Sequence, residues 1–288
     1  MKKLFLLVLL TISLSSCATQ YLRVGSFNLW RSDLGKGDYR WDVRKHRMID
    51  AIKDIGYDLF ASQEVDTTMI KELPELFTNA GLKYQIFIFS PYQEDGGVGN
   101  KAQAIIYNPD RLEMVDDNHF WFSETPDVIS GGWDEMKFKR GACCATFIDK
   151  KTGANFFLMA SHMPLGKVAN LKAASLINER AVKYNTKELP AIFLGDLNTR
   201  PESESSKLLR TYWTDVYLVL PSDKKVGPHG TFNSHDVNKD MEKAPRIDYI
   251  YTRGSNIVPI NYCCFTNLYD GFYPSDHCPI FSDVIIQK

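Results

Sequence analysis

Short apolar segments separated by polar turns dominate the chain, and three longer segments repeat apolar residues at helical spacing. Runs of about four to eight apolar or alternating residues are typical of strands, and apolar positions three and four residues apart indicate amphipathic helices. The pattern predicts helices at residues 42–55, 167–184 and 203–212. It predicts strands at residues 22–29, 58–63, 84–89, 103–107, 141–148, 155–161, 191–194, 247–251, 257–264 and 280–286.

The order of these elements indicates the fold class. Many strands, several of them followed by a helix, favour two stacked sheets covered by helices. No Pro/Gly/Ser-rich linker, repeat or low-complexity tract divides the chain. The candidate functional residues described below extend from residue 28 to residue 277. We therefore expect a single domain over residues 18–288.

Residues 1–17 have the pattern of a secretory signal. Lys2 and Lys3 precede the apolar run 4–12, which is too short to span a bilayer, and small residues follow it. Cys17 stands directly after these small residues, so that the segment resembles a bacterial lipobox. We expect an exported, monomeric lipoprotein anchored to the membrane through Cys17, on the periplasmic or cell-surface side. An ordinary signal peptide that contains a cysteine is the alternative.

The charge of the chain bears on its binding partners, and its cysteine content bears on disulfide formation. The chain has 34 Lys and Arg against 35 Asp and Glu, and loss of Lys2 and Lys3 with the signal leaves 32 against 35, a balance of −3. Proteins that bind long nucleic acids normally show a basic excess, which is missing here. The odd number of cysteines after Cys17, placed in apolar segments, predicts buried thiols. They are Cys143, Cys144, Cys263, Cys264 and Cys278.

Polar side chains end two of the predicted strands. Asn28 stands where the first predicted strand should emerge, so that its amide oxygen could face a cation, and a turn asparagine is an equally open alternative. Glu64 follows the apolar residues 59–61 at the end of the second strand. A carboxylate in such a place is costly unless it is paired or binds a metal ion. This favours a functional role for Glu64.

Two further strands end in the same way. The sequence Gly195-Asp196-Leu197-Asn198 follows a predicted strand, and Asp196 and Asn198, two positions apart, can point toward one centre. A turn built by these two residues is the alternative. His162 ends the strand at 155–161. A lone histidine at such a position is more often an ordinary surface or core residue. Here several other strands also end in polar residues, which favours a contact of His162 with a phosphoryl oxygen.

The Asp276-His277 pair, near the C-terminus, offers an oxygen ligand and a proton-transferring imidazole from one turn. Asp248 lies among apolar neighbours and needs a partner. A carboxylate beside a histidine fixes the orientation and the tautomer of the ring, which makes a pair of Asp248 and His277 a reasonable prediction. A salt bridge between Arg246 and Asp248 is the structural alternative.

Taken together, these motifs resemble the exonuclease–endonuclease–phosphatase superfamily, which includes pancreatic-type deoxyribonuclease, inositol-polyphosphate phosphatases and the deadenylases. The resemblance covers residues 21–288, and residues 120–126 and 269–271 further resemble a bacterial branch related to the deadenylases. Six motifs in the order of the family are specific for the superfamily but not for its substrate. They are Phe27-Asn28, Gln63-Glu64, Ser161-His162, Gly195-Asp196-Leu197-Asn198, Arg246-Ile247-Asp248 and Ser275-Asp276-His277.

The resemblance implies the fold and a metal site. The fold would be α+β, a DNase-I-like four-layer αββα sandwich of two mainly antiparallel sheets flanked by helices, with the site at one edge of the sheets. Asn28, Glu64 and Asp276 would bind Mg²⁺, or Mn²⁺, because a shell of oxygen atoms suits these ions better than zinc.

The resemblance also implies catalytic roles. Asp196 and Asn198 would align or deprotonate the attacking water, with one metal ion or two. His277, oriented by Asp248, would contact the phosphoryl group and stabilise its growing negative charge. His162 would do the same from the opposite side, and Arg140 matches a phosphate-contacting position of the family.

The chain departs from the family pattern at one loop. Many relatives of this branch continue the histidine motif as His-x-Asp-His, whereas His162 is followed here by Met163, Pro164 and Leu165. The family tyrosine near the site would be Tyr92 or Tyr107.

The sequence therefore predicts a lipid-anchored, Mg²⁺-dependent phosphoesterase that hydrolyses its substrate by in-line attack of water. The phosphorylated substrate would be a nucleic acid, a nucleotide, a sugar phosphate or a phospholipid headgroup. A non-catalytic cell-surface binding lipoprotein on the same fold is the alternative. Such a protein would be expected to lack one of the acids or the histidine, and each of these positions is filled here.

Overall fold

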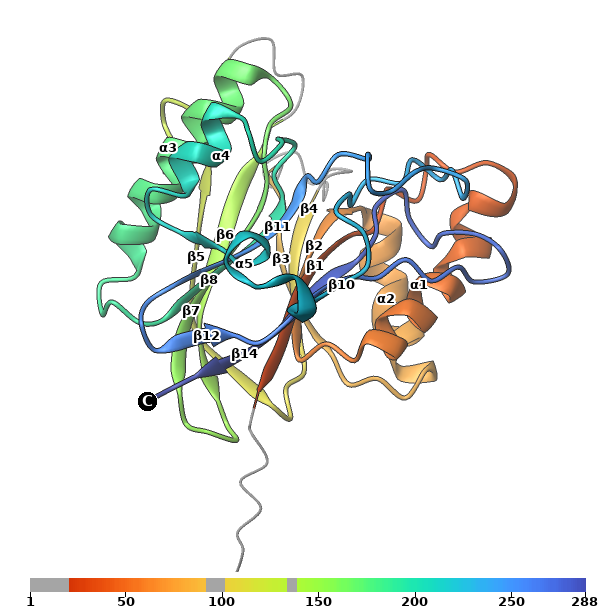
Figure 1. Cartoon of the computed structure of the whole chain (residues 1–288), viewed down its shortest axis with the longest axis horizontal. Coiled ribbons are helices and arrows are strands. Elements are labelled where there is room, and N and C mark those ends of the chain that lie inside the picture. Colours follow the sequence, from red (N-terminus) through yellow and green to blue (C-terminus); the bar gives the residue numbers. More distant parts are fainter. Residues whose placement is uncertain (1–20, 92–101, 134–138) are drawn as a thin grey trace, which may run out of the picture.

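The computed structural model describes residues 21–91, 102–133 and 139–288 (Figure 1). The predicted signal at residues 1–17 and Tyr92 lie outside these residues. The helices are α1 (Trp41–Ile55), α2 (Thr67–Asn79), α3 (Lys167–Tyr184), α4 (Glu204–Leu209) and α5 (Val216–Val219), with 3-10 turns η1 (Gly37–Tyr39) and η3 (Ser222–Lys224). Among the described helices, none has the length and apolar character needed to cross a membrane.

The strands form two sheets. They are β1 (Leu22–Asn28), β2 (Leu59–Val65), β3 (Gln85–Phe89), β4 (Ala102–Tyr107), β5 (Leu112–Trp121), β6 (Gly141–Asp149), β7 (Asn155–His162), β8 (Ala191–Asp196), β9 (Thr214–Asp215), β10 (Lys225–Val226), β11 (Asp248–Arg253), β12 (Ile257–Pro259), β13 (Tyr262–Cys264) and β14 (Ile280–Ile286). One sheet has the order β10–β13–β14–β1–β2–β4–β3, with β12 beside β14, and the other has the order β5–β6–β7–β8–β11–β9.

The sheets face each other, with α1 and α2 outside the first and α3 and α4 outside the second (Figure 1). Neighbouring strand residues face opposite ways, so that each inner strand supplies two apolar layers. On β6, Cys143 packs between the sheets whereas Cys144 packs toward α3. On β2, Leu59 packs between the sheets and Phe60 toward α1 and α2. This is the αββα sandwich that the resemblance implies.

Most predicted elements are present, and the differences have local causes. All five described cysteines are buried and free, as predicted. The predicted strand 257–264 is two short strands, because Pro259 lacks an N–H and the side chain of Asn261 pairs with Asp283. The sequence did not predict α2, which contains Pro74 and is capped by Asp66, whose carboxylate accepts the N–H of Met69.

The β5 strand was also missed, since this edge strand carries exposed acidic residues and a register shift near Asp116 that hide its alternation. The predicted helix 203–212 is the shorter α4, which begins after Ser203. The hydroxyl of Ser203 accepts the N–H of Ser206 and so caps this helix.

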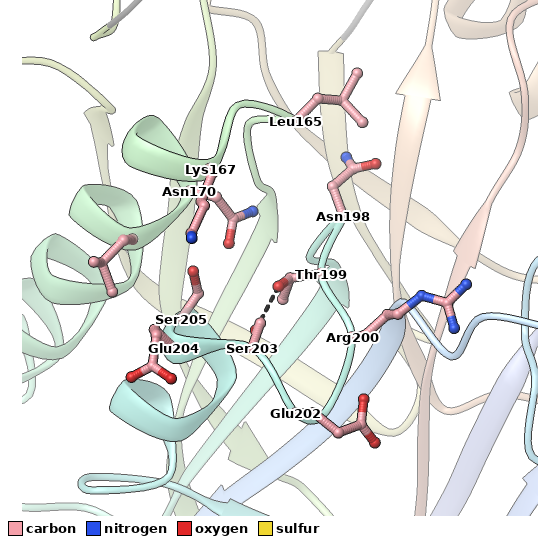
Figure 2. Close-up of a pocket in the computed structure, with 11 residues that line it drawn as sticks. Leu165, Lys167, Asn170, Asn198, Thr199, Arg200, Glu202, Ser203, Glu204 and Ser205 are labelled. Atoms are coloured by element: carbon pink, nitrogen blue, oxygen red, sulfur yellow. Dashed lines mark hydrogen bonds between the residues drawn. The ribbon is translucent and has the colours of Figure 1, made fainter.

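The connections that follow β7 and β8 lie side by side and line a pocket of about 460 Å³ against α3 and α4 (Figure 2). The polar residues that line it include Lys167, Asn170, Asn198, Arg200 and Ser203. Asn170 joins the two connections, because its amide donates to the carbonyl oxygens of Pro164 at 2.7 Å and Leu197 at 2.8 Å. The pocket therefore begins directly beside the strand ends that carry His162 and Asp196.

Candidate active site

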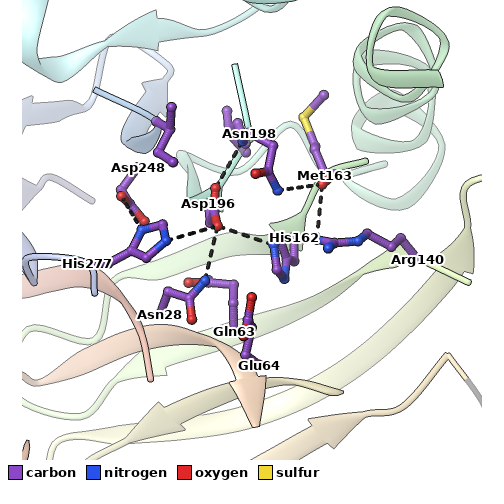
Figure 3. Close-up of polar contacts among 12 residues, drawn as sticks. Asn28, Gln63, Glu64, Arg140, His162, Met163, Asp196, Asn198, Asp248 and His277 are labelled. Atoms are coloured by element: carbon purple, nitrogen blue, oxygen red, sulfur yellow. Dashed lines mark hydrogen bonds and ion pairs between the residues drawn. The ribbon is translucent and has the colours of Figure 1, made fainter. Parts of the chain in front are cut away.

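The polar strand ends predicted from the sequence meet at one end of the two sheets (Figure 3). In the parallel pair of β7 and β8, His162 lies opposite Asp196. In the antiparallel pair of β8 and β11, Asp248 lies opposite Asp196. Asn28 ends β1 in the facing sheet, next to Gln63 of β2. Strand pairing therefore brings residues that are distant in sequence to one edge of the sandwich.

Asp196 lies at the centre of this group. Its Oδ2 atom accepts the amide of Asn28 at 3.1 Å and lies 3.2 Å from Nε2 of His162 and 3.7 Å from Nε2 of His277. Its Oδ1 atom accepts the N–H of Asn198 at 3.0 Å. Burial alone would raise the pKa of Asp196, but the two imidazoles and these hydrogen bonds hold it well below its usual value. The carboxylate therefore stays ionised.

The backbone at Gly195 allows this arrangement. A Cβ atom added there would lie 2.0 Å from the carbonyl oxygen of Ser161 on β7. Because real Cβ atoms do not approach an oxygen so closely, only glycine lets β8 pair with β7 one residue before Asp196.

His277 and Asp248 form the predicted pair. The distance from Nδ1 of His277 to Oδ2 of Asp248 is 2.9 Å, and the hydroxyl of Thr231 donates to the same oxygen at 2.6 Å. Burial lowers the pKa of His277, but Asp248 and Asp196 outweigh it and hold the pKa well above its usual value. The alternative salt bridge does not form, since Arg246 pairs instead with Asp215.

The predicted metal ligands lie beside this group. Asn28 points its Nδ2 at Asp196, and its Oδ1 accepts the N–H of Trp30 at 3.0 Å, which leaves one lone pair of that oxygen. Glu64 has a φ of 59°, a conformation unusual for a side-chain-bearing residue. Burial, with Glu64 and Asp196, raises the pKa of Asp276 to about 6. Oxygen atoms that can bind a metal ion, and negative charge, are thus concentrated around Asn28, Glu64 and Asp276, and this fits a hard cation.

A possible metal site of a different composition is also present. Donor atoms of Asp196, Asp248 and His277 lie within 4.8 Å of one another. His277 and Asp248 already hydrogen-bond each other, and a protonated imidazole cannot bind a metal ion. Of these three residues, Asp196 is therefore the one that could still bind a cation.

The remaining predicted residues surround one backbone carbonyl. Arg140 donates to the carbonyl oxygen of Met163 at 3.1 Å, and the amide of Asn198 donates to the same atom at 2.9 Å. Burial, followed by the charge of Arg140, lowers the pKa of His162. Leu165, which stands where many relatives continue the His-x-Asp-His motif, is largely exposed. The structure thus brings Arg140 to the edge that His162 and Asn198 occupy.

Tyr107 does not belong to this site. It pairs with Leu59 at the start of β2, whereas Glu64 lies five residues further along that strand. At about 3.3 Å per residue, this places Tyr107 roughly 16 Å away. Its hydroxyl instead donates to the Gln85 side chain. Of the two tyrosine candidates, only Tyr92 is left, and it lies outside the described residues.

Sequence reasoning missed two residues that support the site, Thr231 and Arg44. Thr231 lies in an irregular segment, where no periodicity marks it. Arg44 is fully buried on α1, where the apolar residues Trp41 and Met48 lie three and four positions away. A cation between apolar residues at helical spacing was the signal that could have identified it.

The fold and the convergent strand ends define a DNase-I-like sandwich with a polar site at its edge. The chain belongs to the endonuclease/exonuclease/phosphatase family, whose family model matches residues 25–277. Members of this family are generally hydrolases that act on phosphate esters.

Individual relatives are similar to this chain over most of their length. An endonuclease/exonuclease/phosphatase structure from Bacteroides vulgatus is 26% identical, covers 93% of this chain and 100% of its own, and has a TM-score of 0.83. A mannosyl-6-phosphatase structure from Bacteroides thetaiotaomicron is 28% identical, covers 92% and 100%, and has a TM-score of 0.79. An uncharacterized protein of Acanthamoeba polyphaga mimivirus is 25% identical over 84% of this chain and 91% of its own length.

Proposed function

We propose that this protein is a Mg²⁺-dependent phosphoesterase that hydrolyses its substrate by in-line attack of water. The observation that carries the proposal is the position of Asp196, whose buried carboxylate lies between the imidazoles of His162 and His277 and beside Asn28. An ionised acid, two imidazoles and an oxygen-rich ligand set in one place suit metal-assisted hydrolysis of a phosphate ester.

The metal ion would be held by Asn28, Glu64 and Asp276. These residues offer amide and carboxylate oxygens, the ligands that Mg²⁺ and Mn²⁺ favour. Burial, together with the charges of Glu64 and Asp196, raises the pKa of Asp276, and a bound cation would offset these charges. When bound, the ion would polarise the phosphoryl oxygens and offset charge on the leaving oxygen.

The protein's own residues would then orient water and substrate. Asp196, kept ionised by its two imidazoles, would align the attacking water together with Asn198. A carboxylate with so low a pKa is a weak proton acceptor. Asp196 is therefore better suited to align the attacking water than to accept its proton. His277, held protonated by Asp248, would donate to a phosphoryl oxygen as charge develops there. His162 and Arg140 would contact the phosphoryl group from the other side.

We propose a small phosphorylated molecule as the substrate, with a sugar phosphate as the first candidate. One of the most similar structures is a mannosyl-6-phosphatase at 28% identity. The chain has no basic excess of the kind that long nucleic acids need. Nucleotides, short nucleic acids and phospholipid headgroups are the competing substrates.

An activity screen would test this function. Purified protein with Mg²⁺ or Mn²⁺ would be incubated with mannose 6-phosphate, p-nitrophenyl phosphate, bis-p-nitrophenyl phosphate, short DNA and phospholipid. We expect hydrolysis of a monoester that falls on the order of 100-fold or more in Asp196→Asn, Glu64→Gln and His277→Gln. Asp223→Asn, which changes an exposed acid, is the matched control. Unchanged rates in the three site variants would refute the proposal.

The screen also separates the alternative function. Mg²⁺ binding that depends on Glu64, without hydrolysis of any compound in the panel, would instead favour a non-catalytic binding protein.

We further propose that the protein is exported and anchored to the membrane through Cys17. The support is the sequence of residues 1–17 alone. In a bacterial host, the protein should be found in the membrane fraction and should incorporate labelled fatty acid, and Cys17→Ser should release it in soluble form. Incorporation of label by Cys17→Ser would exclude this anchor. We expect a monomer by light scattering.

A further inference from the structure

We propose that Arg44 is the positioning residue that holds the predicted metal ligands Asn28, Glu64 and Asp276 in place, an inference that rests on the proposed Mg²⁺ site. Arg44 lies in the first turns of α1 and is fully buried. The hydrogen-bond acceptors described for it are backbone carbonyl oxygens. A guanidinium in such surroundings is costly to bury, so that its presence needs an explanation.

The first loop that Arg44 holds is the segment after β1. Its Nη1 atom donates to the carbonyl oxygen of Leu29 at 2.7 Å. Its Nη2 atom donates to the carbonyl oxygens of Trp30 and, at 3.2 Å, Arg31. Three consecutive carbonyls therefore turn toward one cation. The planar guanidinium presents several donors in a fixed geometry, which suits this task better than the single ammonium group of a lysine.

The same peptide groups hold two of the ligands on their other side. The N–H of Trp30, in one peptide group with the carbonyl of Leu29, donates to Oδ1 of Asn28 at 3.0 Å. The N–H of Arg31, in one peptide group with the carbonyl of Trp30, lies 3.5 Å from Oε2 of Glu64. Because carbonyl and N–H of a trans peptide point in opposite directions, a cation at the carbonyls turns the N–H groups toward the ligands.

Arg44 also reaches the loop that carries the third ligand. Its Nη1 atom lies 3.3 Å from the carbonyl oxygen of Pro274. The next residue, Ser275, donates to the carbonyl oxygen of Asn28 at 2.7 Å, and its hydroxyl lies 3.3 Å from Oδ1 of Asp276. One side chain therefore joins the backbone segments on which Asn28 and Asp276 are placed.

The surroundings of Arg44 keep it charged. Burial lowers its pKa to about 10, while Asp276, Asp66 and Glu64 act in the opposite direction. The rings of Trp30 and Trp41 lie 5.0 and 5.1 Å from the guanidinium carbon and provide cation–π contacts. Arg44 is thus a permanent cation beneath the ligand loops, and not a group that titrates during function.

Mg²⁺ titration calorimetry on purified protein would test the role. We expect Arg44→Lys, which keeps the charge but loses the fork of donors, and Arg44→Met to bind Mg²⁺ about 10–100-fold more weakly than the wild type, as is usual for residues that orient metal ligands. Arg23→Met is the matched control. Arg23 also donates to a carbonyl oxygen, that of Ile55 at 2.7 Å, but it lies at the opposite end of β1.

A purely structural role predicts different results. All titrations would be made below the unfolding temperature of each variant, and Arg44→Lys serves if Arg44→Met does not fold. In Arg44→Lys, excess Mg²⁺ should restore kcat, whereas it should not restore Asp196→Asn. If the variants bind Mg²⁺ as tightly as the wild type, or more tightly because a repelling charge is gone, the positioning role is wrong while the proposed function stands. If wild-type binding is absent or does not need Glu64, the proposed metal site fails, and this inference fails with it.

Discussion

The Nδ1 atom of His277 lies 2.9 Å from Oδ2 of Asp248, and both side chains are almost completely buried. Since the Nδ1–H group donates to this carboxylate, the Nε2 atom is left to face Asp196 at 3.7 Å. The pair therefore fixes which edge of the imidazole points into the site.

Asp248→Asn should weaken this arrangement without removing a contact to the substrate. We expect the pKa of His277 to fall toward its ordinary value, because the carboxylate that outweighs burial is lost. The kcat on the best substrate should fall on the order of 100-fold. NMR titration of the histidine and steady-state kinetics would measure both effects, with Asp223→Asn as control. A normal kcat together with a lowered pKa of His277 would show that the protonated ring of His277 takes no part in the reaction.

Stabilisation by Mg²⁺ should depend on pH. The pKa of Asp276 is raised to about 6 in the metal-free protein, above the value of about 3.9 for an unfolded chain. The folded protein therefore loses stability as the pH rises through this window, because the carboxylate ionises less readily than in the unfolded chain. Mg²⁺ binds the ionised form and should recover this loss.

The expected result is a larger rise in Tm on addition of Mg²⁺ at a pH of about 7.5 than at about 5. Differential scanning fluorimetry at both pH values would measure it. Asp276→Asn should abolish most of the difference. An equal shift at the two pH values would show that Asp276 does not bind the ion.

The site could be predicted from the sequence where a polar residue ends an apolar strand. Asn28, His162 and Asp196 each follow a run of buried residues. Strand pairing brings His162 to Asp196, and the stacking of the two sheets brings Asn28 to Asp196. Arg44 acts through backbone carbonyls, one of them 230 residues away in the sequence, and Thr231 acts through the side chain of Asp248. No local pattern contains such contacts.

The fold could be predicted where periodicity was strong and failed where another effect dominated. Residues 167–184 form the predicted helix, because small and apolar residues repeat along one side. Pro74 hid α2, although in the structure the cap at Asp66 and the burial of Met69 and Leu73 outweigh it. Tertiary packing, which the sequence does not display, decided this case.

Arg246→Met should destabilise the fold strongly. Arg246 and Asp215 form a buried pair with distances of 2.8 and 3.1 Å, and removal of the cation leaves a buried carboxylate uncompensated. We expect the free energy of unfolding to fall by about 3–5 kcal/mol. Chemical denaturation would measure it. Arg253→Met, which changes an exposed arginine at the end of β11, should cost less than about 0.5 kcal/mol. Equal losses would mean that the buried pair adds nothing.

Gly195→Ala should disturb both the fold and the site. The added methyl group would lie 2.0 Å from the carbonyl oxygen of Ser161, so that β7 and β8 must separate next to Asp196. We expect a loss of about 1–3 kcal/mol of stability, as for other overpacked sites, and a fall in kcat that persists well below Tm. Gly131→Ala, where no described atom lies within 4 Å of the new methyl group, is the matched control and should change neither quantity. A folded Gly195→Ala variant with full activity would show that the close approach of these strands does not position Asp196.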